Sequence, residues 1–179
     1  MEVRVTRRLL WLALALVVFG VLMRLVPHPA NLAPVGAIAL FGGAVLPRRL
    51  GWWLPLAVMA TSDIVLGFYH GMLFTWLAFL LVSLYGLMLR ERGNAFRVPF
   101  GALGSAGIFF VVSNFGVWAQ GRLYEHTWAG LLLCYEMALP FFRNTFAGDF
   151  LYGWLLFGTY ALAVRMARKR GPTAQQTEA

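Results

Sequence analysis

The chain has very few charged side chains for its length. Only 12% of its 179 residues are Asp, Glu, Lys or Arg, about half of the fraction that a soluble domain carries. Hydrophobic residues make up 60% of the sequence, and they lie in long runs separated by short polar breaks. The composition therefore predicts one membrane-embedded domain, with no room for a separate water-soluble module.

Several motifs that would indicate catalysis or disulfide bonding are also missing. Cys134 is the single cysteine, which excludes an intrachain disulfide and a multi-cysteine zinc site. The sequence has no Gly-rich phosphate loop and no His-x-x-Glu-His spacing, so any use of ATP needs another protein and a catalytic metal has no support. We expect no enzymatic activity, and for Cys134 both a ligand role and a role as small buried filler stay open.

Six apolar segments are candidates for crossing a membrane, which takes ~20 mostly apolar residues. The second is short and rich in Gly and Ala, so we expect it to be tucked among its neighbours or partly irregular. A further apolar stretch, 128–142, is interrupted by Glu136 and Pro140 and predicts a short interfacial helix on the outer side. The expected fold is all-α, a polytopic protein with crossings at 9–26, 33–46, 52–69, 72–89, 102–120 and 146–166.

The basic residues indicate how these crossings are oriented. Fifteen Lys and Arg face seven acidic residues, and most of them lie before the first, after the second, after the fourth and after the sixth apolar run. Because Lys and Arg accumulate on the cytoplasmic side, we expect an inner-membrane protein with both termini in the cytoplasm. Its excess positive charge then reflects topology, not nucleic-acid binding. The first run is expected to be a retained helix, residues 1–170 one domain, and 171–179 a disordered cytoplasmic tail.

The unusual polar side chains share one depth, in the outer half of the predicted membrane domain. A charge at the centre of a membrane helix costs roughly 2.5–3.5 kcal/mol, so such residues need a reason to be there. A common depth in distant segments predicts an outward-facing pocket for a small polar or zwitterionic solute. The alternatives are ion pairs that only fix helix register and, less favoured, a membrane enzyme that uses Asp63 and His28. The candidate binding residues are Arg24, His28, Asn31, Asp63, Asn114, Trp118, Arg143, Asn144 and Asp149.

Stretches spread over residues 24–152 resemble a family of small bacterial membrane proteins, DUF6580, which carries no established function. They are Arg-Leu-Val-Pro-His-Pro-Ala-Asn at 24–31, Gly-Ala-Ile-Ala-Leu-Phe-Gly-Gly at 36–43, Ser-Asp at 62–63 followed by Gly67, Ser-Asn-Phe-Gly-Val-Trp at 113–118, and Pro-Phe-Phe-Arg-Asn-Thr at 140–145 followed by Gly-Asp at 148–149.

More distantly, the length and layout resemble the S-components of energy-coupling-factor (ECF) vitamin transporters. This resemblance implies six helices, an outward-facing pocket and a vitamin or related micronutrient as the solute. It also implies either an energy-coupling transmembrane subunit with ATPases as partner or a solitary mode of action. Some solitary members bind cobalamin through a cysteine, but Cys134 cannot be aligned with that cysteine, and the sequence identifies no cofactor.

Overall fold

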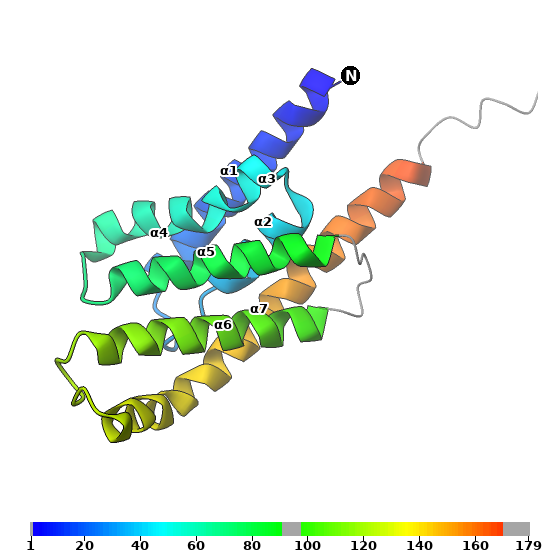
Figure 1. Cartoon of the computed structure of the whole chain (residues 1–179). Coiled ribbons are helices and arrows are strands. Elements are labelled where there is room, and N and C mark those ends of the chain that lie inside the picture. The colour runs from blue at the N-terminus through cyan, green and yellow to red at the C-terminus, as the bar shows by residue number, and fades with distance from the viewer. Residues whose placement is uncertain (1, 91–97, 170–179) are drawn as a thin grey trace, which may run out of the picture.

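The structure of the protein is a computed structural model that describes residues 2–90 and 98–169, apart from the side chains of residues 2–6, 8 and 168. These parts of the chain form helices and no strand (Figure 1), which confirms the all-α class. The predicted tail at 171–179 lies outside the described residues. The helices are α1 (Glu2–Leu25), α2 (Val35–Val45), α3 (Arg48–Gly51), α4 (Trp53–Leu66), α5 (Met72–Leu89), α6 (Val98–Ala119) and α7 (Trp128–Lys169).

The long helices run back and forth between two ends of a bundle. In Figure 1, α1 begins and α7 ends toward the right, while the connections α1–α2, α4–α5 and α6–α7 lie toward the left. We call the left-hand end, with connecting residues 26–34, 67–71 and 120–127, the turn end. The described chain therefore begins and ends at the same end of the bundle, opposite the turn end (Figure 1).

Among residues 2–90 and 98–169, three helices are long and apolar enough to cross a membrane: α5, α6 and α7 up to Ala167. By contrast, α2 has 11 residues and is about 16 Å long at ~1.5 Å per residue, roughly half of a ~30 Å hydrocarbon layer. Irregular backbone at 26–34 precedes α2 on the turn-end side. Most of this irregular stretch precedes the predicted segment 33–46, which is itself short and helical over Val35–Val45.

Helix α2 lies at the centre of the bundle. It contacts α1, α4, α5, α6 and α7, and every residue from Val35 to Gly43 is buried. Its Ile38 and Phe41 pack with Leu16 and Leu54 in the core. A Cβ on Gly43 would overlap the carbonyl oxygen of Ser83 in α5, so this glycine allows the two backbones to approach closely, as small residues do between membrane helices.

The structure differs from the sequence prediction at α7. An interfacial helix at 128–142 was expected to be separate from the crossing at 146–166, but α7 is one continuous helix of 42 residues with Pro140 inside it. Proline removes one backbone N–H and usually ends a helix. Here the helix packs along α6, with Cys134 and Ala138 buried before the proline and Thr145 buried after it. This packing on both sides explains why the helix continues through Pro140.

Candidate functional site

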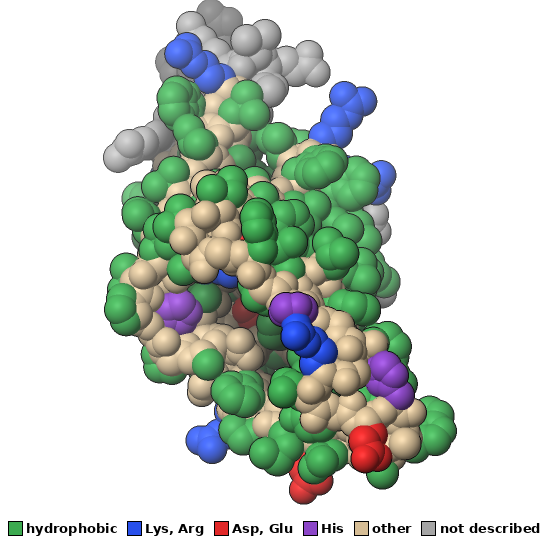
Figure 2. Space-filling view, turned by 90° about the vertical axis from the view of Figure 1, so that its left-hand side faces the viewer, with side chains coloured by type: hydrophobic (Ala, Val, Ile, Leu, Met, Phe, Trp, Pro, Cys, Tyr) green, Lys and Arg blue, Asp and Glu red, His purple; other side chains and the backbone are tan. Residues whose placement is uncertain are grey.

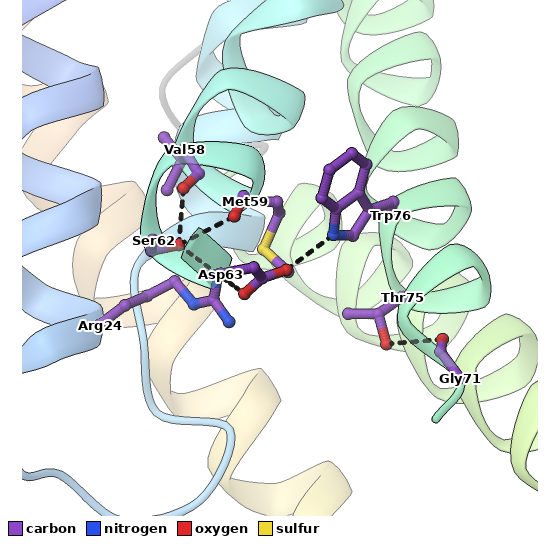
Figure 3. Close-up of polar contacts among 8 residues, drawn as sticks. All are labelled: Arg24, Val58, Met59, Ser62, Asp63, Gly71, Thr75 and Trp76. Carbon is purple, nitrogen blue, oxygen red and sulfur yellow. Dashed lines mark hydrogen bonds and ion pairs between the residues drawn. The ribbon is translucent and has the colours of Figure 1, made fainter. Parts of the chain in front are cut away.

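Arg24 and Asp63, two of the residues predicted to line a pocket, meet at the turn end. Arg24 lies in the last turn of α1 and Asp63 in the last turn of α4. Arg24 Nη1 is 2.8 Å from Asp63 Oδ1, and it also donates a hydrogen bond to Ser62 Oγ (Figure 3). Asp63 is fully buried, whereas the Arg24 side chain keeps 14% of its surface exposed. The pair thus joins an acid that is shielded from solvent to a base that is partly exposed to it.

A third helix holds the other oxygen of Asp63. Trp76 in α5 donates from its indole Nε1 to Asp63 Oδ2 over 2.8 Å, and Ser62 Oγ donates to the Val58 carbonyl over 2.6 Å (Figure 3). Among the described residues, Asp63 Oδ1 accepts no aligned hydrogen bond and is held by the ion pair alone. Arg24, Ser62, Asp63 and Trp76, hereafter the Arg24 cluster, tie α1, α4 and α5 together.

The Arg24 guanidinium keeps unused hydrogen-bond donors. A guanidinium has five N–H groups in a planar fork, but in the described part of the chain only Nη1 has a protein acceptor. Figure 2 looks onto the turn end and shows a hollow there, with acidic and basic side chains in its depth and histidine at its rim. Arg122 and Arg143 at this end are exposed, whereas Arg24 is mostly buried.

Asp149 belongs to a different cluster, at the N-terminus of α2. It is 2% exposed, accepts a hydrogen bond from Ser105 Oγ in α6 over 2.5 Å, and lies against the first turn of α2. Its carboxylate lies where a side chain on Gly36 would be. The N-cap residue of α2, Pro34, has no side-chain cap of its own. Asp149 thus caps α2 from another helix and complements the positive end of its dipole.

Arg90, which was not predicted to be functional, does the same for the other end of α2. It follows α5 and donates to two carbonyl oxygens at the C-terminus of α2. One belongs to Ala44, the next-to-last residue of the helix, and the other to its C-cap Leu46. An acid at the N-terminus and a base at the C-terminus both stabilise a helix. In the sequence Arg90 was one of several basic residues beside an apolar run, so only the contact reveals this role.

Four predicted residues lie in or beside the connection between α1 and α2. His28 and Asn31 are exposed; His28 Nδ1 is 2.7 Å from the Val26 carbonyl, and Asn31 has a left-handed backbone with φ 63°. Asn144 Nδ2 in α7 donates to the Ala30 carbonyl over 3.0 Å, which fixes this connection to α7. Arg143 is exposed beside it. In the described part of the chain, none of these four residues has a hydrogen bond to the Arg24 cluster.

Asn114 and Trp118 on α6 are engaged elsewhere. Asn114 Nδ2 donates to Phe110 of its own helix, and Trp118 Nε1 donates to the Glu125 carbonyl in the turn before α7. Cys134 is buried and points to the Asn114 carbonyl oxygen, 3.4 Å from its Sγ. Within residues 2–90 and 98–169 no three His, Cys, Asp or Glu residues are grouped to hold a metal ion.

Ser62, Trp76 and Ser105 are partners that sequence reasoning missed. Ser62 directly precedes Asp63, and this adjacency was the only signal for it. Trp76 and Ser105 lie inside the predicted crossings 72–89 and 102–120, with no local signal that sets them apart. Their roles depend on which helices pack side by side, which no local pattern gives.

Comparisons with known proteins locate the chain in one family. No curated protein and no solved structure matches it. The model of the family of unknown function DUF6580 matches residues 4–173, nearly the whole chain and all of both clusters. The protein therefore belongs to the DUF6580 family.

Proposed function

We propose that the protein is a bacterial inner-membrane protein that binds a small solute at its turn end, from the outer side, for uptake. The observation that carries this proposal is the Arg24 guanidinium, which has unused donors and partial exposure although its partner Asp63 is fully buried. The remaining donors of Arg24 are not among the buried polar atoms without a partner in the described part of the chain, so they are accessible to an acceptor from solution.

The proposed membrane arrangement has six crossings, with both termini in the cytoplasm. They are the crossings expected from the sequence, at 9–26, 33–46, 52–69, 72–89, 102–120 and 146–166, and they fall on α1, α2, α4, α5, α6 and α7. At ~1.5 Å per residue, the 42 residues of α7 span about 63 Å. About 20 residues cross the hydrocarbon layer, so the first part of α7 would lie at the outer interface. Exposed Arg48, Arg49, Arg165 and Lys169 at the opposite end agree with cytoplasmic Lys and Arg enrichment.

The irregular connection before α2 also supports a solute pocket at the outer side. Within a membrane, backbone outside a helix is tolerated only where it is buried in protein or lines a water-filled cavity. Residues 26–31 are exposed and precede a helix too short to cross on its own. A hollow beside such a segment is where transporter-like proteins place their solutes.

Transport would then follow the S-component pattern. The protein would bind the solute, a vitamin or similar micronutrient, and a separate energy-coupling transmembrane subunit with ATPases would supply the energy. We propose no enzymatic activity and no nucleic-acid partner for this chain.

A structural role is the second candidate, and the capping of α2 favours it. Asp149 and Arg90 are both used to satisfy the ends of a buried helix, so part of the polar set predicted for binding has a structural explanation. In this alternative the Arg24 cluster too would only pair helices.

Native mass spectrometry of the protein, purified in mild detergent from its own host, tests the proposal. Wild type should carry a small molecule that is absent from Arg24→Gln and from Asp63→Asn, while Arg122→Gln, an exposed arginine at the same end, should retain it. If wild type carries nothing, and a vitamin panel leaves its melting temperature unchanged, the structural role replaces the binding role.

A further inference from the structure

The two buried acids at this end of the bundle are closed to a solute. Asp63 is fully buried between Arg24 and Trp76, and Asp149 is held by Ser105 and the N-terminus of α2. An ammonium group or metal ion could reach either carboxylate only by displacing these partners. The sequence allowed a zwitterionic solute whose amine binds an acidic residue. Neither Asp63 nor Asp149 is available for such an amine.

The guanidinium of Arg24, in contrast, is partly exposed and keeps hydrogen-bond donors for a solute. Arg24 Nη1 is fixed by Asp63 Oδ1 and Ser62 Oγ, whereas its Nε and Nη2 have no acceptor among the described residues. Two parallel N–H groups on one edge of a guanidinium match a carboxylate or phosphate. Because the other edge is anchored, this edge is held in place before any ligand arrives, which lowers the entropic cost of binding.

We propose that the solute is an anion, whose carboxylate or phosphate oxygens accept hydrogen bonds from Nε and Nη2 of Arg24. This inference rests on the proposed function and specifies the solute class of that site. Asp63 does not oppose the anion as a free charge would, because its carboxylate is already paired with Arg24 and hydrogen-bonded to Trp76. Asp63 and Ser62 are positioning residues that hold the guanidinium, and Arg24 is the binding residue.

Formate is a suitable probe because it is the smallest carboxylate and fits the site whatever the rest of the natural solute is. The experiment follows the side-chain Nε–H signals of arginine by NMR in ¹⁵N-labelled full-length protein in detergent micelles. Arg24→Lys identifies the Arg24 signal by its disappearance. Formate should shift this signal saturably, at ~10-fold or more lower concentration than the signal of exposed Arg122.

Two matched probes test the charge class. Formamide has the same size without the charge, methylammonium has the opposite charge, and sodium chloride at equal ionic strength controls for screening. None of them should shift the Arg24 signal saturably. No response to formate, or an equal response to formamide, would overturn the anion assignment. A co-purified cationic solute that depends on Arg24 would also overturn it, yet would leave the binding function standing.

A phospholipid headgroup carries the same anionic oxygens, so a second experiment must separate lipid binding from solute binding at Arg24. The titration is repeated in nanodiscs of phosphatidylglycerol. A free solute site predicts that formate still shifts the Arg24 signal there with an unchanged midpoint. Loss of the formate response in nanodiscs alone would assign Arg24 to a lipid phosphate and overturn the proposal of a free anion.

Discussion

Asp149 of α7 lies directly against Gly36 of α2, and its carboxylate fills the place that a side chain on residue 36 would take. The acid reaches the α2 N-terminus only because residue 36 lacks a Cβ. Together with Arg90 at the C-terminus, this contact satisfies the end groups of a short buried helix, which in a membrane cannot be left to water.

Replacing Gly36 with Ala should therefore destabilise the protein. The new Cβ would overlap the Asp149 carboxylate, and α2 or α7 would have to shift, at a cost of about 1–3 kcal/mol. The measurement is thermal unfolding in detergent. Gly107→Ala in α6 is the control, because its Cβ would meet nothing within 4 Å, and it should unfold at or above the wild-type temperature. Equal unfolding temperatures for the two variants would contradict the contact.

Changing Asp149 itself should distinguish its capping role from simple space filling. Asp149→Leu leaves the Ser105 hydroxyl without this acceptor and removes the carboxylate from the N-terminus of α2, and an unpaired buried group costs about 1–3 kcal/mol. Asp149→Asn keeps an acceptor oxygen and should cost clearly less. Chemical unfolding of both variants measures the difference, and a double-mutant cycle with Ser105→Ala should show coupling of about 0.5–3 kcal/mol. If Leu were tolerated as well as Asn, Asp149 would not be a cap.

The sequence put Arg24 and Asp63 in one predicted set, without saying which acid pairs with which arginine, and the structure brings these two side chains into contact. Each interrupts a long apolar run near the same end of its segment, and the cost of burying a charge makes such residues informative. The sequence was not sufficient for Asp149, which shares that depth but contacts α2. The capping contact depends on the packing of α7 across α2, and the residue that permits it, Gly36, looked like one more small residue in a Gly-rich helix.

Helix ends were predicted less well than helix positions. The short second segment was recognisable because its apolar run is too short to cross a membrane. The break expected between 142 and 146 does not occur, because α7 packs along α6 and continues through Pro140. Proline is a local signal, and here tertiary packing outweighs it.

Trp76 offers a test of how firmly Asp63 is held. Trp76→Phe keeps an aromatic ring but removes the N–H that donates to Asp63 Oδ2, so the buried carboxylate loses its hydrogen-bond donor. We expect a loss of about 1–3 kcal/mol in unfolding free energy, measured by chemical unfolding in detergent. Trp128→Phe is the matched control, since Trp128 is 81% exposed, and it should change stability little. Equal losses would show that ring size, and not the indole N–H, is what matters.

A double-mutant cycle on Arg24 and Asp63 separates stability from binding. Each of Arg24→Gln and Asp63→Asn leaves its former partner as an unpaired charge, at a cost of about 3–5 kcal/mol for a buried pair. The double variant carries neither charge, so its loss of unfolding free energy should be well below the sum of the two single losses. If the pair only joins helices, the double variant, once its stability is restored, should behave like wild type in every other measurement. If Arg24 binds a solute, the stable double variant still fails to retain it in native mass spectrometry. Additive losses in the cycle would instead show that the two charges are not coupled, contrary to their 2.8 Å separation.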